Sequence, residues 1–313
     1  MKVLISGATG CVGTVLCEFL ATHGYDVVPV VRRASGRQNE VVVGEIGALT
    51  DWSAALRNVA CIVHLAARVH VMRDHVADPL AEFRAVNVAG TLNLVRQAAE
   101  AGVKRFVFIS SVKVNGEETL PGQPFDADGP AAPEDPYGVS KMEAELGLRE
   151  VSAQTGMEVV IIRSPLVYGP GVRGNFLTLM QWLSRGIPLP LGAIHNQRSL
   201  IALDNLVDLI VTCVSHPAAA GQVFLVSDGE DLSTTELLRR MGAALGRPAR
   251  LLPVPAAWLD GAARLLGKGA VAQRLCGSLQ VDIEKTRRLL DWTPPVTVDE
   301  ALRDTARHFL AQR

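Results

Sequence analysis

The amino-terminal segment, residues 2–20, constrains the fold of this chain more than any other. Residues 2–6 form a short apolar run, Gly7, Gly10 and Gly13 follow at intervals of three, and a helical pattern leads on from there. This order predicts a strand, a glycine turn and a helix. In such a turn the first glycine allows the tight bend, the second lets the backbone approach a pyrophosphate, and the third lets the helix pack on the strand.

The glycine spacing leaves two readings open. It differs by one inserted residue from the familiar Gly-x-Gly-x-x-Gly, so an ordinary turn and a dinucleotide-binding turn both fit. The position of Gly7 directly after the first strand favours dinucleotide binding, because the following helix would offer its unpaired amides to the anion.

Strand-like and helix-like runs alternate along the first half of the chain. Apolar, β-branched runs typical of fully buried parallel strands lie at residues 27–31, 41–43, 61–65, 106–109 and 158–162. Helical patterns lie between them at residues 52–57, 79–101 and 137–155. This alternation predicts an α/β fold with a doubly wound parallel Rossmann sheet.

The composition changes after about residue 165, where loops punctuated by Pro and Gly begin. We therefore predict a dinucleotide-binding Rossmann domain over residues 1–165. Residues 166–313 are expected to form mainly a smaller, partly interleaved substrate lobe, with some segments returning to the Rossmann domain. Within that lobe residues 256–276 are apolar and partly helical, and a core-facing helix is favoured over an interfacial membrane helix.

Composition and charge narrow the classes of function. At 313 residues and 48% hydrophobic residues the chain can bury a sizeable core, which excludes a disordered protein. Its net charge of -1 provides no broad basic field, so nucleic acid is not an expected partner.

Cysteine usage and hydropathy indicate the compartment. The five cysteines, at positions 11, 17, 61, 213 and 276, are dispersed, so free thiols in a reducing compartment and no metal site are expected. The first residues read as a strand rather than a secretion signal, and no apolar stretch of about 18 residues occurs. We expect a cytoplasmic protein without an integral membrane segment.

Tyr137 and Lys141 are the candidate proton-transfer pair, because a spacing of four places phenol and ammonium on one helical face. A fixed cation stabilises phenolate, which suits proton exchange with a substrate oxygen. Ser111 follows the predicted strand at residues 106–109 and would lie at its carboxyl end, where ligands bind. It is predicted to hydrogen-bond the same substrate oxygen, the alternative being a capping or turn serine.

These motifs, in this order, resemble the extended short-chain dehydrogenase/reductases and, more specifically, their nucleotide-sugar epimerase/dehydratase family. The further motifs that carry the resemblance are His64-Leu65-Ala66-Ala67, Asn87-Val88-Ala89-Gly90-Thr91 and Ser110-Ser111. The resemblance spans essentially the whole chain, since residues 198–205 resemble the family's substrate-phosphate segment and residues 282–294 its closing signature. It implies a nicotinamide cofactor, a UDP-sugar substrate and a homodimer.

The resemblance also implies a set of cofactor-binding positions. They are Gly7, Thr9, Gly10, Cys11, Val12, Gly13, Glu45, Ile46, Leu65, Ala66, Ala67, Asn87, Tyr137, Lys141 and Pro165. Arg32 and Arg33 are added to this set because of their chemistry, not because of the resemblance. An acidic residue at the end of the second strand would bind the adenosine ribose, whereas two guanidiniums can pair with a 2′-phosphate. NADPH or NADH is therefore the expected cofactor, with NADPH preferred, unless these arginines are ordinary surface charge.

On the substrate side, Arg198 is predicted to clamp the diphosphate, because a guanidinium makes paired charge-assisted bonds to phosphate. Asn175 is predicted to contact the same group. The alternatives are a surface salt bridge for Arg198 and a loop-shaping role for Asn175. Lys113 fits either a sugar contact or solvent, and His64 is expected to be packed rather than catalytic.

The direction of the reaction is the last inference. No carboxylate pair follows Ser111, which disfavours dehydration, and Asn115-Gly116 stands where epimerases commonly carry Tyr-Gly. The chain most resembles bacterial UDP-4-keto-6-deoxy-N-acetylhexosamine 4-reductases, which form UDP-N-acetylquinovosamine for surface polysaccharide. We therefore predict 4-keto reduction. A UDP-hexose or UDP-N-acetylhexosamine 4-epimerase with bound NAD is the alternative, and a non-catalytic dinucleotide-sensing module the lesser one.

Overall fold

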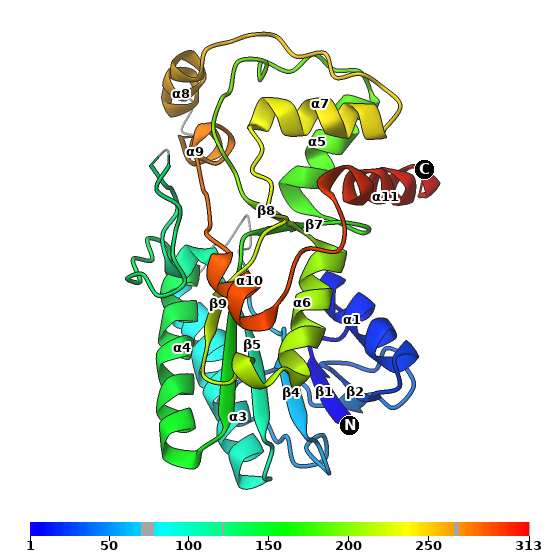
Figure 1. Cartoon of the computed structure of the whole chain (residues 1–313), viewed down its shortest axis with the longest axis vertical. Coiled ribbons are helices and arrows are strands. Elements are labelled where there is room, and N and C mark those ends of the chain that lie inside the picture. Colours follow the sequence, from blue (N-terminus) through cyan, green and yellow to red (C-terminus); the bar gives the residue numbers. More distant parts are fainter. Residues whose placement is uncertain (70–77, 121, 266–268, 313) are drawn as a thin grey trace.

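The computed structural model describes residues 1–69, 78–120, 122–265 and 269–312. Its centre is a parallel sheet of seven strands in the order β3-β2-β1-β4-β5-β6-β9 (Figure 1). The strands are β1 (Lys2–Ser6), β2 (Asp26–Val31), β3 (Val41–Val42), β4 (Cys61–His64), β5 (Arg105–Ser111), β6 (Glu158–Ser164) and β9 (Val223–Leu225). The predicted α/β class and parallel Rossmann sheet are confirmed.

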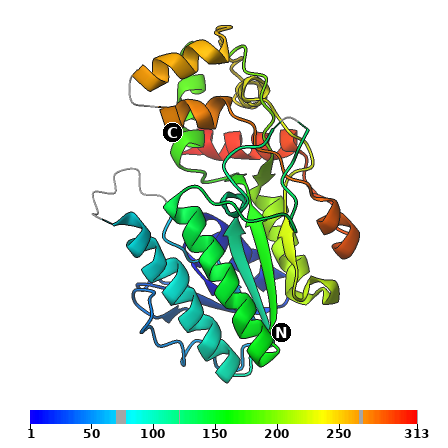
Figure 2. The same cartoon turned by 90° about the vertical axis from the view of Figure 1, so that its left-hand side faces the viewer.

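Both faces of the sheet are covered, which is why its strands are apolar without alternation. Val3 and Ile5 of β1 pack toward helices α1 (Cys11–Thr22) and α6 (Leu203–Ser215). Leu4 points to the other face, which α3 (Thr91–Glu100) and α4 (Pro136–Thr155) cover. Figure 2 shows these last two helices side by side in front of the sheet.

The predicted helices differ from the observed ones at two places. The predicted helix over residues 52–57 is wrong: that segment forms turns, and Asn58 adopts a left-handed φ of 58° directly after it. The predicted helix over residues 79–101 is divided into α2 (Pro79–Phe83), a π-helical turn η1 (Arg84–Gly90) and α3.

The second part of the chain builds a smaller lobe above the carboxyl edge of the sheet (Figure 1). Strands β7 (Leu166–Tyr168) and β8 (Leu200–Ala202) pair in parallel, and a separate hydrophobic core joins α5 (Gly174–Ser184), α7 (Thr234–Ala244) and α11 (Val298–Ala311). Strand β9 and helix α6 lie on the first part instead, and α10 (Glu284–Leu290) packs beside β9. The division at residue 165 stays a prediction.

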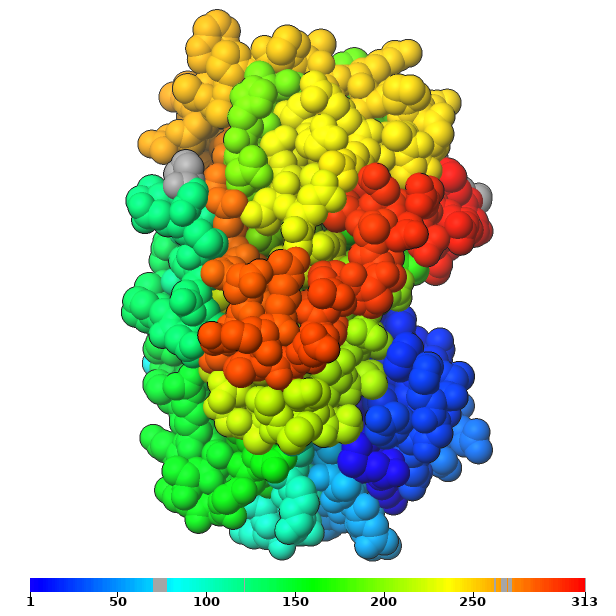
Figure 3. All heavy atoms as spheres, in the orientation of Figure 1, coloured from blue at the N-terminus to red at the C-terminus, as the bar shows by residue number. Residues whose placement is uncertain are grey.

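The molecular surface shows where the two parts of the chain meet. Figure 3 shows the two parts in continuous contact through α10 and α6, with an indentation on the right between α11 and α1. A small cavity of about 170 Å³ separates the glycine turn from the second lobe, lined by Cys11, Val12, Tyr168, Gly169 and Arg173, among others. The carboxyl edge of the sheet thus meets the second lobe beside the glycine turn.

The apolar segment at residues 256–276 forms helices α8 (Ala256–Leu265) and α9 (Gly269–Cys276). Leu259 and Leu275 pack against the core of the second lobe, as expected of core-facing helices, whereas Trp258 and Leu265 are exposed. Residues 266–268, which belong to the same predicted segment, lie outside the described residues. Within the described parts of the chain, no helix combines the length and apolarity needed to span a membrane.

Candidate active site

The glycine turn between β1 and α1 is closed as tightly as backbone allows. Gly7 has a φ of 73°, and a Cβ there would lie 2.8 Å from the Ala66 amide nitrogen. A Cβ at Gly13 would lie 2.2 Å from the Gly7 carbonyl oxygen, and Gly10 caps α1 without any side-chain hydrogen bond. The first-turn amides of α1 therefore face a cradle that fits a pyrophosphate, with Thr9, Gly10 and Cys11 exposed at its rim.

We expect Gly13→Ala to cost most of the dinucleotide affinity, by about 100-fold or more, because the added methyl must push α1 away from the turn. Fluorescence titration with NADH and thermal unfolding would measure the effect. Gly261→Ala is the control, since a Cβ on that helical glycine meets nothing within 4 Å and should leave binding unchanged. Equal affinity of Gly13→Ala and the unsubstituted protein would contradict the proposed cradle.

The residues after β4 lie beside this turn, because Ser6 and His64 are register partners at the ends of adjacent strands. Leu65, Ala66 and Ala67 are therefore at the carboxyl edge, half-buried. His64 lies within 2.6 Å of Ser6 Oγ and 2.9 Å of Thr91 Oγ1, and burial, then the nearby Lys141, lowers its pKa to about 3. It is a neutral, packed histidine, as the sequence predicted.

At the end of β2 the structure places a carboxylate that the sequence did not connect with the arginines. Arg32 forms an exposed ion pair with Glu45 at 3.3 Å, while Arg33 is exposed. Ile46, the next residue, is half-buried against Gly90 at the end of η1. Arg37, absent from the predicted set, donates to Thr14 Oγ1 on α1 at 2.9 Å. One of the two guanidiniums expected to attract a 2′-phosphate thus has a carboxylate partner.

Asn87 lies buried in the π-helical turn η1, a feature often found at functional sites. Its amide bonds both backbone groups of Arg68, at 2.8 and 3.0 Å, and donates to Ser140 Oγ on α4 at 3.0 Å. The segment after β4 is thereby tied to the helix that carries Tyr137. The sequence motif predicted a role for Asn87 beside the sheet, but it contains no signal for the π turn.

Helix α4 begins with Asp135 as its N-cap and Pro136 in its first turn, so Tyr137 lies at the amino-terminal end of the helix. The Tyr137 ring contacts Phe83 edge-on at 5.9 Å. One turn later, Lys141 is buried, donates to the Ile109 carbonyl oxygen at 2.7 Å and lies 4.1 Å above the Phe108 ring. The ammonium is therefore held against the last residues of β5.

Burial dominates the proton affinities of this pair. It lowers the pKa of Lys141 to about 7, with Glu145 opposing the shift. It raises the pKa of Tyr137 to about 12, and the Asp135 carboxylate adds to this increase. Tyr137 is thus a protonated phenol at neutral pH, ready to donate, and it needs additional positive charge before it can serve as a base.

Ser111 ends β5, in register with Ser164 at the end of β6. Its Oγ accepts from the Lys113 amide at 3.2 Å and caps the short 3-10 turn η2 (Val112–Val114). Ser111 is therefore a capping residue in this structure, as the alternative proposed. A substrate contact by the same partly exposed hydroxyl stays a prediction. Pro165 directly follows Ser164 and is buried between β6 and β7.

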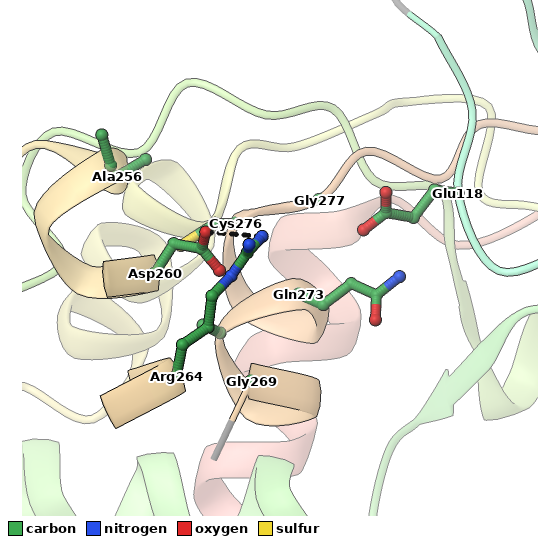
Figure 4. Close-up of a pocket in the computed structure, with 10 residues that line it drawn as sticks. Glu118, Ala256, Asp260, Arg264, Gly269, Gln273, Cys276 and Gly277 are labelled. Carbon is green, nitrogen blue, oxygen red and sulfur yellow. Dashed lines mark ion pairs between the residues drawn. The ribbon is translucent and has the colours of Figure 1, made fainter. Parts of the chain in front are cut away.

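The two predicted phosphate ligands lie in different settings. Asn175 is exposed on the first turn of α5, whereas Arg198 is partly buried and donates to the Gly277 carbonyl oxygen at 3.0 Å. Burial lowers the pKa of Arg198, and Glu118 opposes the shift. Gly277 also lines a cavity of about 570 Å³ between α8, α9 and the loop of Glu118 (Figure 4). The sequence offered no signal for this cavity.

Polar side chains line the cavity both on α8 and on the side formed by α9 and the loop of Glu118. Figure 4 shows Arg264 paired with Asp260 on α8, and Gln273 and Glu118 facing each other from α9 and the loop. Among the described residues, no three His, Cys, Asp or Glu side chains gather as metal ligands would.

The parallel Rossmann sheet, the glycine cradle and the Tyr137 and Lys141 pair on α4 together define a short-chain dehydrogenase/reductase. Residues 3–227 match the model of the NAD dependent epimerase/dehydratase family, and the chain belongs to that family.

Several relatives cover nearly the whole chain, 4-epimerases among them. It is 51% identical to the UDP-glucose 4-epimerase of Vibrio cholerae, over 99% of this chain and 95% of that protein. It is 30% identical to the N-acetyl-alpha-D-glucosaminyl-diphospho-ditrans,octacis-undecaprenol 4-epimerase of Escherichia coli O157:H7, over 98% of this chain and 95% of that protein.

Among solved structures, UDP-glucuronic acid 4-epimerase of Bacillus cereus, in complex with UDP-glucuronic acid and NAD, superposes with a TM-score of 0.80 at 21% identity, over all of both chains. UDP-glucose 4-epimerase of Thermotoga maritima, with UDP-glucose, gives 0.79 at 21% identity, over 100% of this chain and 99% of that one. These likenesses concern the fold.

Proposed function

We propose that this chain is a UDP-hexose 4-epimerase that uses NAD. The observation that carries the proposal is the 51% identity, over nearly the whole chain, to a protein named UDP-glucose 4-epimerase. A second relative, 30% identical over nearly the whole chain, is also named a 4-epimerase, so the epimerase alternative is better supported than the 4-keto reduction predicted from sequence. The proton-donating phenol on α4, above the carboxyl edge of the sheet, is compatible with chemistry at a sugar hydroxyl.

In this proposal the bound dinucleotide accepts hydride from carbon 4 of the sugar and returns it to the opposite face. Tyr137 exchanges the proton of the 4-hydroxyl, and Ser111 hydrogen-bonds the same oxygen. Lys141, fixed by its bond to the Ile109 carbonyl oxygen, would supply positive charge one helical turn from Tyr137 when its amine is protonated. The glycine cradle binds the pyrophosphate of the dinucleotide, and Arg198 and Asn175 bind the diphosphate of the sugar nucleotide.

A 4-keto reductase is the second candidate, and one observation favours it. No carboxylate directly follows β2, and Arg33 is exposed there, which leaves room for a 2′-phosphate. The ion pair between Arg32 and Glu45 weakens this argument, because Glu45 supplies a carboxylate near the same edge. NADPH use, a homodimer and a role in surface polysaccharide synthesis stay predictions.

One pair of assays separates the two candidates. Incubation with UDP-glucose and NAD should yield UDP-galactose until the epimers equilibrate, with no net change in NADH absorbance. Incubation with a UDP-4-keto-6-deoxy-N-acetylhexosamine and NADPH should leave the absorbance unchanged. Stoichiometric NADPH consumption, without epimerisation of any UDP-hexose or UDP-N-acetylhexosamine, would overturn the proposal in favour of the reductase.

A further inference from the structure

Lys113 joins the two segments that carry the predicted proton-transfer residues. It lies two positions after Ser111, and its Nζ bonds Asp135, which lies two positions before Tyr137. A second ion pair at 2.8 Å links Nζ to Glu117. All three side chains are mostly buried, with exposed fractions of 27%, 22% and 19%. From the sequence, Lys113 fits either a contact with the sugar or exposure to solvent. In the structure it has two carboxylate partners instead.

Asp135 uses its two oxygens for different tasks. Oδ1 accepts from the Gly138 amide at 2.6 Å and caps α4, while Oδ2 receives Lys113. The start of α4 also packs directly on the 3-10 turn, since a Cβ at Gly138 would lie 2.8 Å from the Lys113 carbonyl oxygen. Through Lys113 and Asp135, the end of β5 and the first turn of α4 are held as one unit.

Charge provides a second link within this unit. Burial acts to raise the pKa of Asp135, but the bonds from Lys113 and the Gly138 amide hold it below its usual value, so the carboxylate is ionised. That carboxylate in turn makes phenolate formation at Tyr137 less favourable. The Lys113 ammonium lies on the same carboxylate and offsets its field.

We propose that Lys113 is a positioning residue: through Asp135 it sets the geometry between Ser111 and Tyr137 and offsets the carboxylate charge beside the phenol. The inference rests on the proposed function only insofar as Ser111 and Tyr137 act on one sugar oxygen. Lys113 itself contacts neither substrate nor cofactor in this role.

Several other charged groups around the first half of α4 have partners of their own. Arg84 of η1 pairs with Glu143, Arg163 of β6 pairs with Glu145, and Arg68 pairs with Glu82 of α2 at 3.6 Å. Lys141 on the same helix is bound to β5. These groups are common to all the variants below, so a difference between the variants reports on Lys113 and Asp135.

The test uses the chain of 313 residues and four variants of it. Lys113→Met removes the ammonium, Asp135→Asn removes the carboxylate but keeps a capping oxygen, the double variant removes both, and Lys113→Arg restores a cation. Two readouts are compared: kcat and KM for the C4 reaction, and the ionised fraction of Tyr137 at a fixed alkaline pH. The latter is read from ¹³Cζ-tyrosine NMR, assigned with Tyr137→Phe, in a chain with three tyrosines.

We expect Lys113→Met to lower kcat about tenfold, with KM changed less than about threefold, and Lys113→Arg to recover most of the loss. The ionised fraction of Tyr137 should fall in Lys113→Met, rise in Asp135→Asn and return close to its original value in the double variant. A structural role alone does not produce opposite shifts that cancel.

Shifts of the same sign in both single variants, no shift in either, or a raised KM at unchanged kcat would overturn the inference. Failure of the proposed function looks different. If the unsubstituted chain turns over no UDP-hexose or UDP-N-acetylhexosamine, the epimerase proposal falls, while the NMR readout still reports on the coupling of Lys113, Asp135 and Tyr137.

Discussion

Replacing Tyr137 with Phe should lower kcat for the C4 reaction by about 1,000-fold, within the range typical of a lost general acid or base. The substitution removes one hydroxyl and keeps the ring that contacts Phe83 edge-on, so the start of α4 should keep its structure. KM for the UDP-sugar should change little, because the substitution leaves the proposed diphosphate ligands, Arg198 and Asn175, unaltered. Initial rates of epimer formation, with circular dichroism as a check on folding, would measure the effect.

Tyr25→Phe is the matched control for this prediction. Tyr25 lies before β2 and packs partly against the core on the α1 face of the sheet, so the same loss of a hydroxyl should leave kcat within about twofold. If Tyr137→Phe retained more than a tenth of the activity, proton transfer would have to be assigned to another group. The sensor alternative would regain support if the unsubstituted chain bound NAD but catalysed nothing.

The sheet could be predicted from sequence because its strands carry their own signal. The runs that became β1, β2, β4, β5 and β6 have apolar centres without alternation, as is typical of strands buried on both faces. Strand β9 was not predicted: it spans three residues, Val223–Leu225, and only its pairing with β6 distinguishes it from a loop. The π turn η1 was missed for a similar reason, since the surrounding pattern reads as one uninterrupted helix.

Pairings between distant side chains were outside the reach of sequence reasoning. Arg32 and Glu45 are separated by 13 residues and Lys113 and Asp135 by 22, and no local pattern says that either pair will meet. Local motifs, by contrast, place their own atoms: the glycine turn and the spacing of Tyr137 and Lys141 are set by backbone geometry that the sequence displays directly.

These unseen contacts bear on the direction of the reaction. Asn115 was read as a departure from epimerases, yet its side chain accepts from Arg163 at 3.1 Å and donates to the Asp126 carbonyl at 3.0 Å. It is buried and holds a loop in place. Its identity therefore says little about the sugar, and the ion pair of Arg32 similarly weakens the argument for NADPH. The buried hydrogen bonds of Asn115 and the ion pair of Arg32 therefore both weaken the case for one-way reduction.

A buried network behind the site leads to the second large prediction. Glu145 lies one turn after Lys141 on α4 and pairs with Arg163 of β6 at 2.7 Å, with exposed side-chain fractions of only 2% and 5%. Glu145 also accepts from Ser110 Oγ at 2.5 Å, and Arg163 donates to Asn115. The network connects α4 with strands β5 and β6, one helical turn along from Lys141.

Glu145→Leu should lower the free energy of unfolding by about 3–5 kcal/mol, because it leaves the Arg163 guanidinium buried without its counter-charge. Urea denaturation monitored by fluorescence and circular dichroism would measure the loss. Glu143→Leu is the matched control on the same helix: Glu143 pairs with the more exposed Arg84, so its loss should cost about 1 kcal/mol or less.

The double variant Glu145→Leu/Arg163→Met distinguishes a charge effect from a packing effect. Removing both charges should recover more than half of the lost stability, since apolar side chains of similar size can replace a buried ion pair. Activity should not recover to the same extent, because Glu145 acts to raise the pKa of Lys141 against the effect of burial, and without it Lys141 carries less charge at neutral pH. A double variant no more stable than Glu145→Leu would show that the network stabilises the fold through its shape rather than through its compensating charges.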